Sequence, residues 1–191
     1  DFLQTHPTPS LGELPRYYKS EDYISHTDSK RNLFEKVYQL IKKFSLQRKL
    51  KLINSFSHEG KVILDFGCGT GDFLKQANKD GWAIFGIEPN NEARNLANVK
   101  TNNVVFNSEQ LSKFKEESFD VITLWHVLEH VPEPLVYLNS LKGLLKPNGR
   151  IILALPNYKS HDAAHYGNFW AAYDLPRHLF HFSKKSVSFF A

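Results

Sequence analysis

The sequence contains no methionine and only one cysteine, Cys68, among its 191 residues. One thiol cannot form an internal disulfide, and one cysteine alone cannot build a zinc site. A reducing, cytoplasmic setting is therefore the simplest expectation. Because no methionine stands even at position 1, we expect the sequence to be part of a longer gene product.

Long apolar runs are absent too. No run reaches the roughly 18 residues that a membrane helix needs, and the first residues lack the basic-then-apolar pattern of a signal peptide. We therefore expect no membrane partner. The net charge is only +4. The densest basic stretch, residues 42–51, could contact nucleic acid, but a solvated helix face is the preferred interpretation, so nucleic acid is not an expected partner.

Strand-like and helix-like patterns alternate from about residue 60. Buried-strand patterns cover residues 61–66, 82–87, 103–106, 119–125 and 150–155, and helical patterns cover 72–80, 91–99 and 132–145. This alternation predicts a doubly wound α/β fold with a parallel sheet, whose ligands bind at the carboxyl ends of the strands. We expect an N-terminal arm with one or two amphipathic helices over residues 1–56 and the ligand-binding core over 57–191.

A glycine-rich segment, Gly-Cys-Gly-Thr-Gly at residues 67–71, follows the first predicted strand. Glycines let the backbone turn sharply and let a ligand approach the main chain. A tight turn is the structural alternative, but the position between a strand and a helix is that of a nucleotide site. A dinucleotide fingerprint would need a third glycine where Asp72 stands. An anionic pyrophosphate is also poorly placed beside that carboxylate.

The second predicted strand ends at Glu88, whose carboxylate could accept two hydrogen bonds from ribose hydroxyls or simply face solvent. Asp65, the glycine segment and Glu88 together resemble the cofactor site of class I S-adenosylmethionine-dependent methyltransferases, whose first motif is Asp-x-Gly-x-Gly-x-Gly. That cofactor has a cationic sulfonium and no phosphate, so Asp65 is compatible with it. The resemblance implies the ribose role for Glu88 and a Rossmann-like sheet of strand order 3-2-1-4-5.

The fourth predicted strand runs into His126-Val-Leu-Glu129-His130. His-x-x-Glu-His matches an inverted zinc-protease signature, but that chemistry needs a long helix and a third ligand, and Pro132 follows closely, so no metal site is expected. The segment is similar to small-molecule methyltransferases of the ubiquinone-biosynthesis type, where it lines the methionine end of the cofactor and the substrate entrance. The resemblance makes His126 a candidate base, and leaves Glu129 and His130 open between a supporting and a structural role.

Beyond the fifth predicted strand, Arg177-His178-Leu-Phe-His181-Phe-Ser183 resembles a segment of the methyltransferase domain 23 group. The resemblance implies that Arg177 and His178 face the substrate pocket, although a structural role stays open for His178 and His181. Ser183 would cap the next helix. The complete fold of this class carries two more strands at the sheet edge than the five counted here, and some relatives carry a zinc ribbon before the arm, so we expect the core to be C-terminally incomplete.

The resemblance implies cofactor contacts from Asp65, Gly67, Cys68, Gly69, Gly71, Glu88, Pro89, Ser108, Glu109, Trp125 and His126. Ser108 or Glu109 would contact the adenine, and the catalytic candidates are His126, Arg177 and His178. The predicted function is transfer of a methyl group from S-adenosylmethionine to an oxygen, nitrogen or carbon atom of a small molecule. The alternatives are a non-catalytic S-adenosylmethionine-binding module, an RNA methyltransferase and, disfavoured by Asp72, a dehydrogenase.

Overall fold

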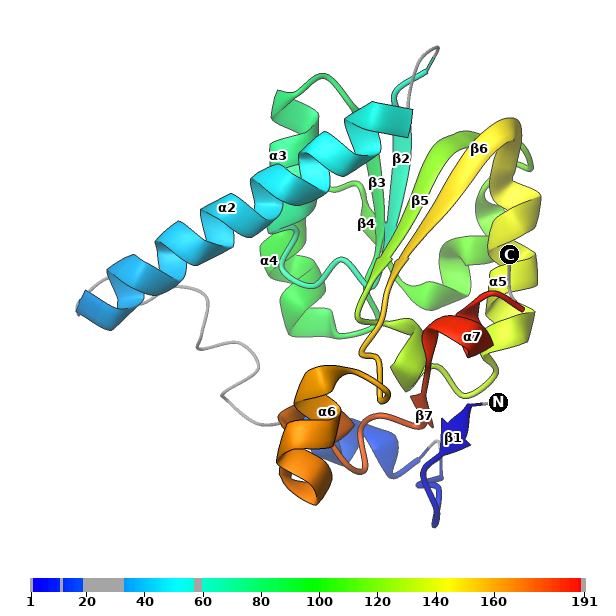
Figure 1. Cartoon of the computed structure of the whole chain (residues 1–191). Helices are drawn as coiled ribbons and strands as arrows, with labels where there is room; N and C mark the ends of the chain where they lie inside the picture. Colours follow the sequence, from blue (N-terminus) through cyan, green and yellow to red (C-terminus); the bar gives the residue numbers. More distant parts are fainter. Residues whose placement is uncertain (1, 11, 19–32, 57–59, 190–191) are drawn as a thin grey trace.

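The computed structural model describes residues 2–10, 12–18, 33–56 and 60–189 and centres on a five-stranded parallel sheet (Figure 1). Its strands are β2 (Val62–Phe66), β3 (Ala83–Ile87), β4 (Val105–Phe106), β5 (Phe119–Trp125) and β6 (Leu145–Ala154). They lie in the order β4-β3-β2-β5-β6, all parallel. Counted from β2, this is the order 3-2-1-4-5, so the predicted doubly wound Rossmann-like fold is confirmed.

Helices cover both faces of this sheet (Figure 1). One face carries α2 (Leu33–Phe56), α3 (Asp72–Lys79) and α4 (Asn91–Thr101), and the other carries α5 (Pro134–Leu144). Two apolar layers result, because alternate residues of a strand point to opposite faces. Ile63 and Val121 pack with α2 and α3, whereas Leu64 and Ile122 pack with α5. Burial on both faces explains why these strands read as continuous apolar runs.

Shorter elements complete the described chain. The 3-10 turns are η1 (Leu14–Tyr18), η2 (Ser108–Lys113), η3 (Leu128–His130), η4 (Gly167–Phe169) and η5 (Ala171–Tyr173). The short helices are α6 (His161–Tyr166) and α7 (Lys184–Val187). As predicted, Ser183 caps α7, because its hydroxyl accepts a hydrogen bond from the Ser186 N–H at 3.1 Å.

Strand β6 begins earlier than its pattern predicts. The turn signal Pro-Asn-Gly at residues 147–149 suggested a strand starting at Arg150. In the structure Phe119 pairs with Leu145 and Val121 pairs with Arg150, so the residues between Leu145 and Arg150 form a bulge inside the strand. A bulge accommodates turn residues without ending the pairing.

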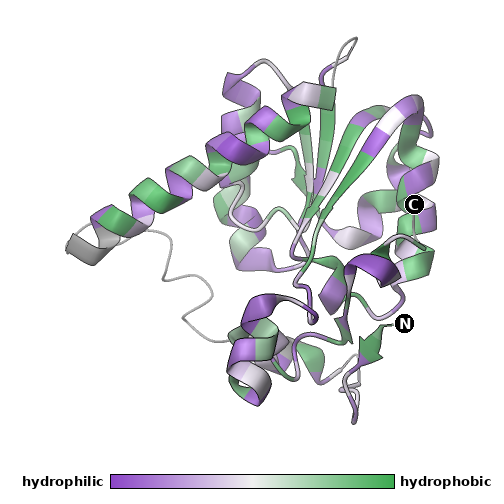
Figure 2. Ribbon diagram, in the orientation of Figure 1, coloured by the Kyte–Doolittle hydropathy of each residue, from purple (hydrophilic) through white to green (hydrophobic). Residues whose placement is uncertain are grey.

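Helix α2 is one continuous helix, and only its second half joins the core. Leu50 and Ile53 are buried against the sheet layer, whereas Leu40, Ile41 and Phe44 on the earlier turns are exposed. Figure 2 shows this helix extending away from the sheet with apolar residues along its length. The predicted amphipathic pattern therefore corresponds to packing only near the carboxyl end.

Among the described helices, none is long and apolar enough to cross a membrane.

A second, two-stranded sheet joins the two ends of the chain. β1 (Leu3–Gln4) pairs antiparallel with β7 (Phe180–His181). The Thr5 hydroxyl donates to the His178 carbonyl at 2.6 Å and lies 3.1 Å from His181 Nε2. The sequence suggested an irregular arm here, so this pairing is a correction. A two-residue strand has too few positions to show alternation.

Candidate functional site

The glycine loop links β2 to α3 at the carboxyl edge of the sheet. Gly67, Gly69 and Gly71 have φ angles of +75°, +54° and +75°, which are conformations that other residues rarely adopt. The N–H groups of Gly67 and Cys68 both donate to the Ile87 carbonyl, at 2.8 and 3.1 Å. The loop is thereby tied to the end of β3, the neighbouring strand.

The three glycines serve different purposes. A Cβ atom on Gly67 would lie 2.4 Å from a methyl group of Val127, and one on Gly71 would lie 2.9 Å from the Cβ of Ala97. These two positions allow close packing within the protein. A Cβ on Gly69 would meet no atom within 4 Å. Gly69 therefore borders open space in which a ligand can approach the main chain.

Cys68 turns its side chain away from that space. Its sulfur would lie 2.8 Å from a Cβ on Gly86, which places the thiol beneath the loop against β3. Burial raises the pKa of the Cys68 thiol, with Asp65 and Glu88 adding to the effect. The thiol is packing rather than a nucleophile.

Glu88 follows β3 and joins the loop to the start of α4. Its Oε2 accepts the Gly69 N–H at 2.8 Å, and its Oε1 accepts the Asn90 N–H at 2.9 Å. Burial raises the pKa of Glu88, and these two backbone donors oppose the rise. Each carboxylate oxygen has two lone pairs, so each can accept one further hydrogen bond. Pro89, also predicted to contact the cofactor, is exposed beside it.

Asp65, near the end of β2, lies beneath the loop and is 2% exposed. Burial raises its pKa to about 7, while the Thr123 hydroxyl, which donates to Oδ1 at 2.7 Å, and the nearby Lys49 act to lower it. Burial in turn lowers the pKa of Lys49, and Asp65 opposes that change. Asp65 and Lys49 thus lie close together in a partly desolvated environment at the carboxyl ends of the strands.

The raised pKa of Asp65 predicts a pH-dependent stability. The folded protein keeps a proton that the unfolded chain releases above pH 4, so this group's contribution is lost as pH rises towards 7. We expect the free energy of unfolding to fall between pH 5 and pH 8 by about 2 kcal/mol more in the wild type than in Asp65→Asn. Urea unfolding at each pH measures the difference. Equal pH profiles for the two proteins would contradict it.

Trp125 ends β5 and packs against Lys49. The Lys49 ammonium lies 4.5 Å from the centre of the Trp125 ring, and the Phe73 ring meets Trp125 edge-on at 5.6 Å. The indole Nε1 is buried and has no hydrogen-bond partner among the described residues. Sequence analysis missed Lys49, because a cation on a helix before the first core strand has no local signature.

Ser108 and Glu109 lie where β4 gives way to η2, at the same sheet edge as Glu88. Ser108 is half-buried, and its hydroxyl donates to the Asn107 side chain at 3.1 Å, whereas Glu109 is exposed. Their place after the third core strand is the one that the resemblance implied. Their contact with an adenine stays a prediction.

Asp72, at the first position of α3, is neutralised by two lysines. Its oxygens lie 2.6 Å from Lys42 Nζ and 2.9 Å from Lys100 Nζ. Burial acts to raise the pKa of Asp72, but the two ammonium groups outweigh it and hold the pKa below its usual range. The expectation that Asp72 would repel an anionic ligand is therefore weaker than the sequence suggested. The absence of the third glycine of a dinucleotide fingerprint remains an argument against a dinucleotide site.

His126 follows β5 directly and has a φ of +59°, a left-handed conformation for a residue with a side chain. Its N–H donates to the Ala154 carbonyl at 2.9 Å, and the next residue, Val127, contacts Gly67. His126 Nδ1 lies 3.5 Å from Glu129 Oε1. Since η3 is a single 3-10 turn, the long helix of a zinc protease is absent from this described segment.

The histidine-rich segment after β6, residues 177–183, packs against His130 and Glu129. The His178 and His130 rings meet edge to face with their centres 4.6 Å apart. His178 Nδ1 lies 2.9 Å from the Ala172 carbonyl. Burial, with His130 next, lowers the pKa of His178. Arg177 donates two hydrogen bonds to Asp174, at 2.9 and 2.7 Å. The structure thus brings His178 to the His126 segment and holds Arg177 by an acid.

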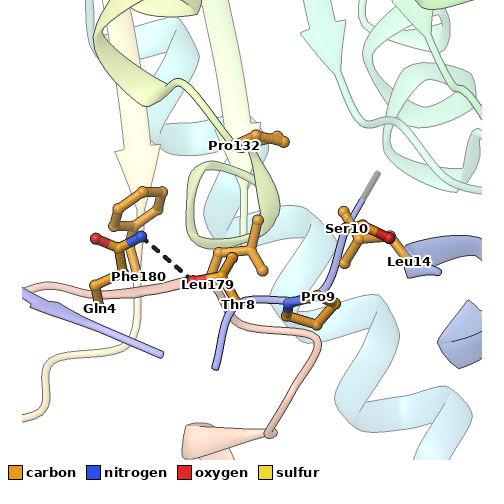
Figure 3. Close-up of a pocket in the computed structure, with 8 residues that line it drawn as sticks. All are labelled: Gln4, Thr8, Pro9, Ser10, Leu14, Pro132, Leu179 and Phe180. Atoms are coloured by element: carbon orange, nitrogen blue, oxygen red, sulfur yellow. Dashed lines mark hydrogen bonds between the residues drawn. The ribbon is translucent and has the colours of Figure 1, made fainter. Parts of the chain in front are cut away.

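A cavity of about 340 Å³ lies on the arm side of β7 (Figure 3). Its lining comes from three parts of the chain: Gln4, Thr8, Pro9, Ser10 and Leu14 of the arm, Pro132 before α5, and Leu179 and Phe180. None of the predicted cofactor contacts lines it. The cavity is a consequence of the arm folding back over β7.

A family model described as a methyltransferase domain matches residues 28–188. The ubiquinone biosynthesis O-methyltransferase of Paraburkholderia phymatum is 34% identical over 139 residues, which are 68% of this chain and 60% of that protein. The enzyme of the same name from Actinobacillus pleuropneumoniae serotype 7 is 36% identical over 109 residues, 51% of this chain and 47% of that protein. The chain thus spans about half to three fifths of the length of these relatives.

Two solved structures share the fold. The magnesium protoporphyrin IX methyltransferase of Synechocystis PCC 6803, with bound SAH, superposes with a TM-score of 0.70 at 15% identity, covering 95% of this chain and 87% of that one. A SAM-dependent methyltransferase from Archaeoglobus fulgidus gives a TM-score of 0.64 at 21% identity, covering 78% and 66%. At these identities the likeness concerns the architecture.

Proposed function

Because the chain belongs to the methyltransferase-domain family, whose cofactor is S-adenosylmethionine, we propose that it transfers a methyl group from this cofactor to the oxygen atom of a small molecule. The preference for oxygen comes from the relatives, which are named O-methyltransferases. The setting we propose is the cytoplasm, where the free thiol of Cys68 would stay reduced.

The observation that carries the proposal is the fit between the carboxyl edge of the sheet and this cofactor. Open space borders Gly69, and the buried indole donor Trp125 Nε1 has no hydrogen-bond partner in the described part of the chain. Glu88 offers two acceptor positions suited to a ribose diol. Asp65 and Lys49 place an acid and an amine near each other, which suits the ammonium and carboxylate of an amino acid. This donor set matches S-adenosylmethionine from its ribose to its methionine end.

The cofactor supplies an activated methyl group on a sulfonium ion, so the protein's own contribution is binding, orientation and proton removal. Glu88 and the loop would fix the nucleoside, and Asp65 with Lys49 would fix the methionine end. His126 stands beside the loop with an exposed ring and would accept the proton that the acceptor hydroxyl loses. His178 would stay neutral and shape the acceptor side, because its pKa is lowered. Arg177 would meet the acceptor only after leaving Asp174.

The test is binding followed by turnover. We expect isothermal titration calorimetry to show one S-adenosylmethionine site, and S-adenosylhomocysteine to accumulate when catechol is added as a probe acceptor. A panel of phenols, carboxylates and amines then identifies the acceptor atom. Tight cofactor binding with no transfer to any probe would indicate a non-catalytic module, and NADH binding without S-adenosylmethionine binding would overturn the proposal.

A further inference from the structure

Glu129 is a buried carboxylate that the proposed function leaves unexplained. Its side chain is 1% exposed, and neither oxygen accepts a hydrogen bond from the described residues. Burying a carboxylate without a partner is unfavourable, so such groups are normally paired. The candidates for pairing are the imidazoles of His126, His130 and His178, which surround it.

Two of these three rings have another partner. The Nδ1 atoms of His130 and His178 lie 3.1 and 2.9 Å from the carbonyls of Arg177 and Ala172. A carbonyl oxygen only accepts, so each Nδ1 carries the hydrogen. One ring nitrogen each of His130 and His178 lies within 4.8 Å of a Glu129 oxygen. In a neutral ring whose Nδ1 carries the hydrogen, the other nitrogen is an acceptor and cannot donate to Glu129.

The other charges nearby are already paired. Asp174 accepts two hydrogen bonds from Arg177, so this acid and base compensate each other. The remaining nitrogen that faces Glu129 is His126 Nδ1, 3.5 Å from Oε1. The His126 side chain is 62% exposed, and its two ring nitrogens are distinct sites that can serve different partners. If Nδ1 donates to Glu129, Nε2 is left for another partner on this exposed ring.

The backbone holds His126 in this place. Its left-handed conformation, with φ of +59°, is strained for a residue with a Cβ. The hydrogen bond to Ala154 and the packing of Val127 on Gly67 fix the segment on both sides. Strained conformations that persist in this way gather at functional sites. In the proposed function, this position beside the glycine loop is where the methyl acceptor would arrive.

We propose that Glu129 is a positioning residue for His126, which it holds through Nδ1–H so that Nε2 is the atom that takes the acceptor's proton. This inference rests on the proposed function. The step is a proton transfer alone: the O–H bond of the acceptor breaks, its electron pair stays on oxygen, and the proton moves to Nε2. Nδ1 keeps its own hydrogen against Glu129. The exposed ring then passes the new proton to water.

A double-mutant cycle tests this pairing. With catechol as acceptor, we expect Glu129→Gln and His126→Gln each to lower kcat by about 100-fold. The double variant should be no more than about twofold slower than His126→Gln alone, because groups that act as a unit are not additive. The KM for the cofactor should not change. With 4-nitrocatechol, which is already ionised at pH 8, the single-variant losses should shrink.

A second measurement does not depend on the acceptor. In protein labelled with ¹⁵N-histidine, the His126 signal, identified by its loss in His126→Gln, should show the Nδ1–H tautomer. Glu129→Gln should remove that preference and Glu129→Asp should partly keep it. The matched control, Glu133→Gln, changes an exposed acid four residues on and should alter neither tautomer nor kcat.

The outcomes separate this inference from the proposed function. An unchanged His126 tautomer in Glu129→Gln, or additive losses in the cycle, would overturn the inference while wild-type cofactor binding and transfer still stood. Activity that required an added divalent cation only when Glu129 was present would also overturn it, because the carboxylate would then serve a metal. Absence of cofactor binding by the wild type would instead count against the proposed function.

Discussion

Replacing Glu88 with alanine is expected to weaken S-adenosylmethionine binding by about 100-fold or more. A hydrogen bond to a charged acceptor contributes about 1.5–3 kcal/mol, and two such bonds to the ribose would be lost. The change also removes the acceptor that ties Gly69 and Asn90 together. The loop would then have to be ordered at the moment of binding, which costs affinity. Titration calorimetry at constant pH measures the change in dissociation constant.

Two further variants make the Glu88 result interpretable. Glu92→Ala removes an exposed acid from the first turn of α4 and should leave the affinity unchanged. Glu88→Gln keeps the shape and one acceptor oxygen, so its affinity should fall between wild type and Glu88→Ala. If Glu88→Ala binds within threefold of the wild type, Glu88 does not hold the ribose. If that variant does not fold, the glutamine variant decides.

Replacing Gly67 with alanine is expected to lower the free energy of unfolding by about 3 kcal/mol. The left-handed backbone accounts for about 1–2 kcal/mol, and the 2.4 Å approach to Val127 adds an overpacking cost of about 1–3 kcal/mol. Because Val127 adjoins His126, relief of the clash would displace the histidine as well. Urea unfolding gives the stability, and methyl transfer measured below the unfolding range gives the effect on His126.

Gly69 and Gly81 provide the matched comparison. Both have positive φ, +54° and +89°, and a Cβ on either would meet no atom within 4 Å. Alanine at either position should cost only the backbone strain, about 1–2 kcal/mol of stability. Only Gly69→Ala should weaken cofactor binding, because its methyl group enters the space that the ligand needs. If Gly67→Ala proves no less stable than Gly81→Ala, the contact with Val127 is not a tight one.

The sheet could be predicted because its signals are local. Phe119–Trp125 forms β5 with the predicted bounds, since a run of buried residues between polar turns leaves little freedom in placing a central strand. Helix α3 begins at Asp72, as predicted, and ends at Lys79, just before Gly81. Pairing between β1 and β7 could not be predicted, because it joins residues at opposite ends of the chain with no periodicity in either.

The candidate site likewise contains residues that the sequence could locate and residues that it could not. Glu88 and the loop could be located because their positions after two consecutive strands form a recognisable motif. Lys49 could not, since its role depends on the angle at which α2 crosses the strand ends. Glu129 was seen in the sequence, but its significance depends on a buried environment. That environment is completed by His178, which lies 49 positions further along the chain.

The contacts of Thr5 with the segment around His178 constrain the order in which parts of the protein can fold during synthesis. The parallel sheet and α2 both lie before residue 155, so they can pack together while the later residues are still being synthesised. The segment that carries His178 and His181 cannot make its hydrogen bonds to Thr5 until it has itself been made. The residues proposed to hold the cofactor are therefore available to a growing chain before those proposed to meet the acceptor exist. During synthesis, a nascent chain would acquire the capacity to hold its cofactor before it acquired the surroundings in which to use it.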